Sequence, residues 1–236
     1  MNREFKRGFA VGCLLAAGWT AGGPLHGETL EDAPRFTVRL YNYAKVDGLE
    51  LGRAVQAASN VFHRASIELV WVDCPVSRRE GERNSACGQF DGRPWVQLKI
   101  LPREMARRLQ LGHEVFGVAV GSNAYVYLHR VQELSSQRGL PESLILGHVM
   151  AHELGHVLLG PGNHTPTGVM IADLKRGDLP IILQGGLVFS PDQAARMQAR
   201  LQHPTAAISS APPADSASAP AGAGCSGADP AASRLR

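Results

Sequence analysis

Two histidines and a glutamate stand at a spacing that suits a metal ion. The segment His152-Glu-Leu-Gly-His156 puts the two histidines four residues apart, and residues four apart share one face of a helix. Both imidazoles can therefore direct a ring nitrogen at one ion, with Glu153 beside it. Because a catalytic zinc takes three protein ligands and keeps one position open for water, the pattern predicts a zinc hydrolase centre that needs one more ligand.

Several residues could supply the third ligand. No glutamate follows Glu153, which excludes a zinc site completed by a glutamate on a later helix. The remaining candidates are His148, His164, Asp173, Asp178, Asp192 and His203. His148 precedes His156 by two helical turns, about 12 Å along the axis at about 1.5 Å per residue. One straight helix cannot bring both of them and His152 to one ion, so His148 is expected in the cleft wall, behind a ligand, or in the core.

His164 is the third ligand that we predict. It follows His156 by eight residues, after a Gly160-Pro-Gly turn that can fold the chain back under the helix. The predicted metal ligands are thus His152, His156 and His164, the predicted cofactor is Zn²⁺, and Asp173 is the alternative third ligand. A coincidental helix with three histidines and no metal is the competing interpretation.

The spacing of apolar residues and the positions of capping and turn residues predict the helices and strands that position these residues. A helix is expected from Pro141 to about Leu159, where Gly160 stops it. Apolar residues alternate in four expected strands, 36–43, 67–72, 95–100 and 124–128. Helices are expected over 49–64, 102–109 and, from the capping box at Ser190, 190–202. Together they predict an α+β fold in which a mixed, twisted sheet of about four to five strands packs on helices, opening with a βαβ unit.

The metal-binding segment resembles the metzincin clan of zinc endopeptidases, whose pattern is H-E-x-x-H-x-x-G-x-x-H followed by a Met-turn. The resemblance implies a metzincin-like fold with Glu153 as catalytic base, Gly160 as the chain-reversing glycine and Met170 in the Met-turn. In this sequence three residues separate His156 from Gly160 and three separate Gly160 from His164, whereas the family has two in each place. No tyrosine follows Tyr127, so the tyrosine that some family members have after the Met-turn is missing. The resemblance also implies that the strand at 124–128 lies along the active-site cleft, where its edge would bind an extended peptide.

These residues predict an exported zinc-dependent endopeptidase that hydrolyses peptide bonds through a zinc-bound water, with Glu153 as general base. The alternative is an exported zinc-stabilised binding protein of metzincin-like fold without proteolytic activity. His129 and Arg130, at the end of a predicted strand, would meet substrate or lie in a solvated loop. His113 and Glu114 are a weaker metal pair that we expect at the surface.

The two ends of the chain differ from its middle. Residues 1–27 combine a basic start, a short apolar run and small residues, which is typical of a secretory signal peptide. Residues 28–203 form the expected catalytic domain, and the Ala/Ser/Pro-rich segment 204–236 is expected to be disordered. The predicted location is therefore secreted or periplasmic. The apolar run is too short to span a membrane, so no membrane span is expected after signal removal.

The cysteines and the net charge limit the classes of partner that this chain is expected to have. In an oxidising compartment Cys74 and Cys87 are expected to form a disulfide, whereas Cys225 is expected to be unpaired. The formal net charge is +3, and residues 1–27 carry most of it. That balance gives no electrostatic footprint for nucleic acid. The expected partner is a peptide or protein substrate, and the chain is expected to be a monomer.

Overall fold

The computed structural model describes residues 33–77, 85–88, 93–108, 115–172, 179–185, 187–203 and 233–235. The predicted signal peptide and several candidate residues, namely His113, Glu114, Asp173, Asp178 and Cys225, lie outside these residues. None of the described helices is long and apolar enough to cross a membrane.

One mixed sheet forms the base of the molecule. Its strands are β1 (Arg35–Asn42), β2 (Glu68–Cys74), β3 (Trp95–Leu101), β4 (Gly117–Val120), β5 (Asn123–Tyr127) and β6 (Ser233–Leu235). Their order is β2-β1-β3-β5-β4-β6. The first four in this order run parallel, whereas β4 is antiparallel to both β5 and β6.

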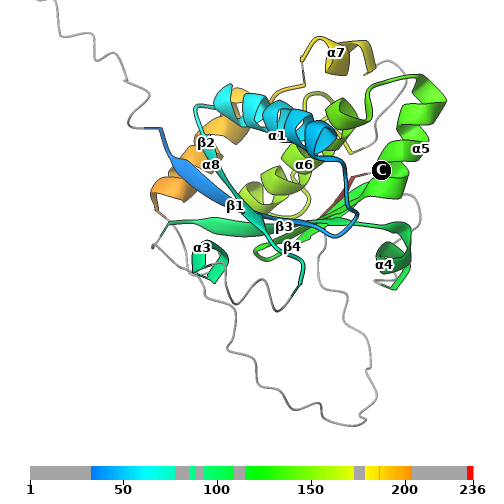
Figure 1. Cartoon of the computed structure of the whole chain (residues 1–236). Coiled ribbons are helices and arrows are strands. Elements are labelled where there is room, and N and C mark those ends of the chain that lie inside the picture. Colours follow the sequence, from blue (N-terminus) through cyan, green and yellow to red (C-terminus); the bar gives the residue numbers. More distant parts are fainter. Residues whose placement is uncertain are drawn as a thin grey trace, which may run out of the picture. The chain divides into compact units, whose positions relative to one another are not determined.

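Helices cover the sheet, and one of them carries the candidate metal ligands. They are α1 (Gly48–His63), α3 (Ser85–Gly88), α4 (Arg103–Arg108), α5 (Leu128–Arg138), α6 (Glu142–Leu159), α7 (Leu179–Leu183) and α8 (Pro191–Gln202). In Figure 1, α1, α6 and α8 lie on one face of the sheet. Sixteen of the residues of α6 are buried, which explains why its sequence is apolar nearly all round.

Close contact between α1 and α6 depends on small residues. A Cβ atom built on Gly147 would lie 2.6 Å from the backbone oxygen of Ala54 and 2.6 Å from the Cβ of Ala57. The absence of a side chain at Gly147 thus lets the two helices approach. The opposite side of α6 faces the sheet, where Val38, Leu98 and Val126 are fully buried.

The four predicted strands and the four predicted helices are all present, and the βαβ opening is the parallel pair β1 and β2 joined by α1. The capping box at Ser190 is confirmed, since its side chain accepts from Gln193 N and the Gln193 side chain accepts from Ser190 N. The sequence did not predict β4, β6 or the helices α3, α5 and α7. The disulfide between Cys74 and Cys87 is also confirmed, and a bridge over a loop of this size stabilises by roughly 3 kcal/mol.

The prediction that the strand at 124–128 offers a peptide-binding edge is wrong. β5 lies between β3 and β4 and pairs with both, so its backbone groups are already used in the sheet. The strand beyond it, β4, was not predicted because it is only four residues long.

The expected disordered tail needs a correction at its far end. Residues 204–232 and 236 lie outside the described part, but Ser233–Leu235 form β6, which pairs with β4. The tail's composition gives no apolar face for a core, yet strand pairing uses only backbone groups, and the outer edge of β4 provides them.

Candidate metal centre

His152 and His156 come from the buried second half of α6. Their relative exposures are 0% and 3%, because this stretch of helix lies between the sheet and the segment that follows Gly160. The four-residue spacing brings the two rings together, with centroids 4.6 Å apart. Helix periodicity alone explains this pair.

His164 joins them from the segment after the helix. Its Nε2 atom lies 3.0 Å from Nε2 of His156, which in turn lies 2.9 Å from Nε2 of His152. The ligand atoms of the three residues all lie within 4.8 Å of one another. The structure therefore brings together the three predicted ligands, and three imidazole nitrogens are a donor set typical of catalytic zinc.

Hydrogen bonds behind the rings fix which nitrogen carries the proton. Nδ1 of His152 lies 2.8 Å from the carbonyl oxygen of Val169, and Nδ1 of His156 lies 3.4 Å from that of Gly160. A carbonyl oxygen only accepts, so each Nδ1 donates and each neutral ring keeps its lone pair on Nε2. Two lone pairs then meet across 2.9 Å, an arrangement that a bound cation would stabilise.

Electrostatics keep these rings in the form that binds metal. Burial, followed by the neighbouring His156, lowers the pKa of His152 well below its ordinary value. Burial and the nearby His164 lower the pKa of His156 to about 4. Both imidazoles are therefore neutral at pH 7, and neutral imidazole is the ligand form.

Glu153 follows His152 directly on α6, and its carboxyl group is buried. It is fully buried, and neither carboxyl oxygen has a hydrogen-bond partner among the described residues. Burial raises its pKa well above the ordinary value. Its side chain packs against β4, since a Cβ atom on Gly117 would lie 2.7 Å from Oε1 of Glu153. The carboxyl group is thus sterically confined and chemically unsatisfied, as a proton acceptor at a reaction site would be.

A network around Asn163 holds the segment that carries His164. Gly160, with φ of +88°, lets the chain turn away from α6. The Asn163 side chain then donates to the carbonyl oxygens of Leu159 (2.7 Å) and Gly160 (3.1 Å) at the end of α6. Its Oδ1 accepts from Arg196 on α8 at 2.7 Å. The residue directly before His164 is therefore hydrogen-bonded to both α6 and α8.

Met170 fills the space beneath the helix. It is fully buried, and a Cβ atom on Gly155 would lie 2.6 Å from its sulfur. The same chain segment accepts the His152 hydrogen bond through Val169 and is itself bonded to Val188 at 3.1 Å. Met170 and Val169 thus support the helix from below.

Three other candidate ligands lie elsewhere. The buried His148 contacts the carbonyl oxygen of Leu144 at 2.8 Å through Nδ1 and is not part of the histidine group, so it is a residue of the helix packing. Asp192 pairs with Arg196 at 3.5 Å and its side chain is 76% exposed. His203 is exposed at the end of α8.

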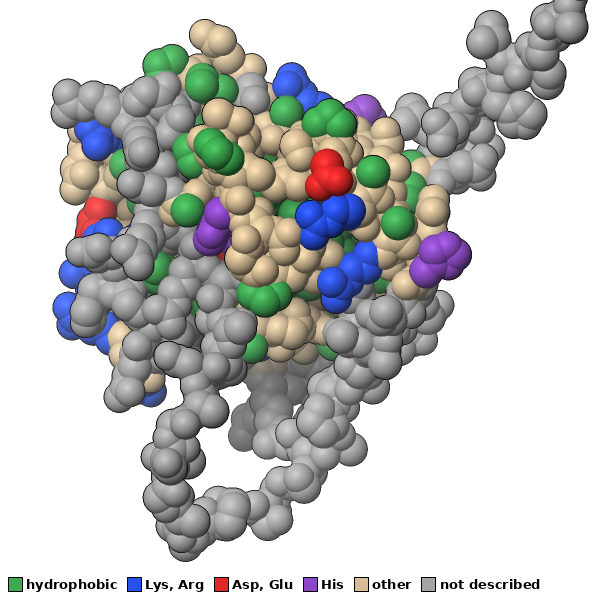
Figure 2. All heavy atoms as spheres, turned by 180° about the vertical axis from the view of Figure 1, so that it is seen from behind, with side chains coloured by type: hydrophobic (Ala, Val, Ile, Leu, Met, Phe, Trp, Pro, Cys, Tyr) green, Lys and Arg blue, Asp and Glu red, His purple; other side chains and the backbone are tan. Residues whose placement is uncertain are grey.

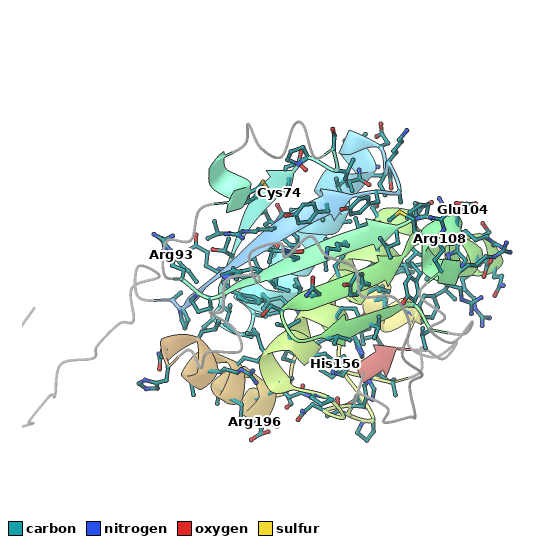
Figure 3. All side chains as sticks on the ribbon, turned by 90° about the horizontal axis from the view of Figure 1, so that it is seen from below. Cys74, Arg93, Glu104, Arg108, His156 and Arg196 are labelled. Carbon is teal, nitrogen blue, oxygen red and sulfur yellow. A yellow bond between two sulfur atoms is a disulfide. The ribbon has the colours of Figure 1, made fainter. Side chains whose placement is uncertain are left out.

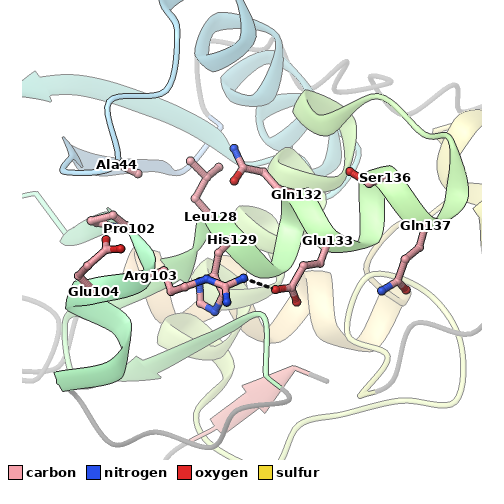
Figure 4. Close-up of a pocket in the computed structure, with 10 residues that line it drawn as sticks. All are labelled: Ala44, Pro102, Arg103, Glu104, Leu128, His129, Gln132, Glu133, Ser136 and Gln137. Carbon is pink, nitrogen blue, oxygen red and sulfur yellow. Dashed lines mark hydrogen bonds and ion pairs between the residues drawn. The ribbon is translucent and has the colours of Figure 1, made fainter.

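His129 and Arg130 lie in the first turn of α5, so the expected solvated loop is wrong. His129 lines a pocket of about 620 Å³ between α4 and α5, in which Arg103 binds Glu133 at 2.5 Å (Figure 4). Arg130 bonds the other oxygen of Glu133. None of the three metal ligands lines this pocket.

Charged side chains are dispersed on the visible surface. On the face shown in Figure 2, Lys and Arg side chains lie in small, separate groups among neutral atoms.

The sequence reasoning missed two residues that shape the site, Asn163 and Gly117. Asn163 stands directly before a predicted ligand and after a glycine turn, a position where side-chain to backbone hydrogen bonds are common. Gly117 opens a short apolar run between two glycines, which is a weak strand signal. Neither signal identifies the residue that is contacted, because Arg196, which bonds Asn163, and Glu153, which packs on Gly117, lie far away in the sequence.

No protein-family model and no curated protein sequence matches this chain. Several solved structures are similar to it, including the two that follow. A zinc-dependent peptidase from Methanocorpusculum labreanum is 14% identical over 68% of this chain and 99% of its own, with a TM-score of 0.47. Archaemetzincin from Methanopyrus kandleri is 16% identical over 72% of this chain and 98% of its own, with a TM-score of 0.37. Because both TM-scores lie below 0.5, neither likeness bears on the chemistry of this chain.

Proposed function

We propose that the chain is an exported zinc-dependent endopeptidase in which His152, His156 and His164 hold Zn²⁺ and Glu153 is the general base. The observation that carries the proposal is the convergence of three imidazole Nε2 atoms, one of them on the residue that directly precedes the buried Glu153 on α6. Zinc in such a site supplies Lewis acidity, which acidifies water and polarises a carbonyl oxygen.

Glu153 supplies the proton transfers. Its carboxylate takes a proton from the attacking water and passes it to the leaving amine nitrogen. Burial alone would hold this carboxyl group protonated at higher pH than usual, whereas a nearby divalent cation favours the ionised form. Metal binding would thus switch Glu153 into the form that can accept a proton.

Met170 and the Asn163 network have supporting roles in this proposal. We assign Met170 to a Met-turn, because its buried sulfur lies under Gly155 of the metal-binding helix. Asn163 compensates for the extra residues around Gly160, because it ties the longer connection to the end of α6.

We also propose that the protein is exported to the periplasm or secreted, and acts as a monomer. The disulfide between Cys74 and Cys87 supports export, because such bonds persist mainly in oxidising compartments. The signal-like composition of residues 1–27 points the same way.

The test separates metal binding from catalysis. Glu153→Gln should keep stoichiometric zinc and lose about 10²- to 10⁴-fold in the cleavage rate of an unstructured protein such as casein, since that is the usual contribution of a general base. His203→Ala is the control, because this histidine is exposed at the end of α8. An active Glu153→Gln protein would remove Glu153 from the mechanism. Zinc in the wild type without any cleavage would favour the binding-protein alternative.

A further inference from the structure

β4 is the strand that lies against the proposed general base. A Cβ atom on Gly117 would lie 2.7 Å from Oε1 and 2.8 Å from Cγ of Glu153. The strand also contacts α6 directly. A chain that pairs with the outer edge of β4 is therefore brought next to the metal-binding helix.

That edge already has an occupant. β6 pairs with β4 in antiparallel register, with Leu235 opposite Gly117, Arg234 opposite Val118 and Ser233 opposite Ala119. β6, the red arrow in Figure 3, also contacts α6. The C-terminal end of β6 is thus the end nearest Glu153.

We infer that the chain's own segment Ser233–Leu235, which pairs with the outer edge of β4, competes for that edge with an extended peptide substrate. The inference rests on the proposed endopeptidase function, because only that function supplies a peptide substrate that competes with the segment. Strand addition is held by main-chain hydrogen bonds, so an edge that accepts one extended chain accepts others. Only one chain can pair with the edge at a time, and the segment must leave before a substrate pairs.

The direction of β6 indicates which part of a substrate it displaces. The chain runs from Ser233, opposite Ala119, to Leu235, opposite Gly117, and so approaches Glu153 with its C-terminal end. A substrate that pairs in the same direction would place there the residues that precede its cleaved bond. The occupant therefore competes with the N-terminal half of a substrate.

The expected competition is modest. Three residues give a short pairing, but the segment belongs to the same chain, and a tethered segment acts at an effective concentration in the millimolar range. A weak segment at that concentration lowers the apparent affinity for substrate by about two- to tenfold.

The experiment uses the full chain with zinc and two proline pairs. The double variant Ser233→Pro with Arg234→Pro removes two successive backbone donors of β6, of which one faces β4 because successive donors point in opposite directions. The control is Ser216→Pro with Ala217→Pro, in the same Ala/Ser/Pro-rich segment but outside the described residues. Amide hydrogen exchange across residues 117–120 reports on the pairing, and steady-state cleavage of a quenched peptide reports on the competition.

The inference expects faster exchange in β4 and a two- to tenfold higher kcat/KM, mainly through KM, in the Ser233/Arg234 variant only. A synthetic peptide copying residues 227–236 should inhibit that variant competitively. Unchanged exchange in β4 would overturn the occupancy, and faster exchange with unchanged kcat/KM would overturn the competition. If neither protein cleaves although both hold zinc, the proposed function fails, while hydrogen exchange still decides whether β6 occupies the edge.

Discussion

Helix α6 and the segment that follows it, residues 160–171, supply the same metal site in different ways. His152 and His156 are fixed by the helix itself, and both are almost fully buried. His164 is only partly buried, and its position depends on Asn163, which bonds residues of α6 and α8. The helix thus provides a preformed pair of ligands, whereas the third ligand is placed by contacts between residues distant in sequence.

The two regions also support each other. Val169, in the later segment, accepts the hydrogen bond that orients His152, and Met170 packs under Gly155 of the helix. Asn163 bonds the connection after Gly160 back to the end of α6.

The largest expected effect comes from removing one ligand from each region. His152→Ala and His164→Ala should each weaken zinc binding by more than about a hundredfold, because even residues behind the ligands contribute about 10- to 100-fold. Zinc competition titrations measure this loss.

Without zinc the two variants should differ. His152→Ala leaves the buried carbonyl of Val169 without its donor, which costs about 1–3 kcal/mol in the free energy of unfolding. His164→Ala should cost less, since that ring is partly exposed. Equal losses in urea denaturation of the two apoproteins would contradict the distinction between the regions.

A smaller effect is expected where the regions pack together. Gly155→Ala forces a methyl group to within 2.6 Å of the Met170 sulfur and 2.8 Å of Phe189, so it should lower the free energy of unfolding by about 1–3 kcal/mol. Gly52→Ala, in α1 with no atom within 4 Å of the new Cβ, should raise it by up to about 1 kcal/mol. Thermal unfolding compares the pair, and a neutral Gly155→Ala would show that Met170 does not support the helix.

The smallest effect should come from loosening the later segment alone. Asn163→Ala removes the bonds to the end of α6 and to Arg196, so zinc affinity should fall by about tenfold while the zinc stoichiometry stays the same. Asn60→Ala on the exposed face of α1 is the matched control. If both variants bind zinc as tightly as wild type, the loop places His164 without Asn163.

Much of the fold could be predicted because its signals are local. Alternation of apolar residues identifies β1, and the capping box at Ser190 identifies the start of α8. β4 gives a weak signal because four residues show too little alternation. α5 gives a weak signal because it has no side-chain cap at its start and only Leu128, Val131 and Leu134 are buried. The left-handed Gly139, with φ of +65°, ends α5 and was a usable signal for that helix.

The sequence by itself determined that His152 and His156 meet on one face of α6, with Glu153 between them in the chain, because four-residue spacing on a helix is a local property of the backbone. It also favoured His164, since a glycine turn and a third histidine follow at a reachable distance. Only the tertiary structure decided that Asn163 bonds α6 and α8 next to this histidine, that β4 lies beyond β5 in the sheet, and that β6 pairs with the outer side of β4. These outcomes depend on pairings between residues far apart in the chain, which local periodicity does not encode.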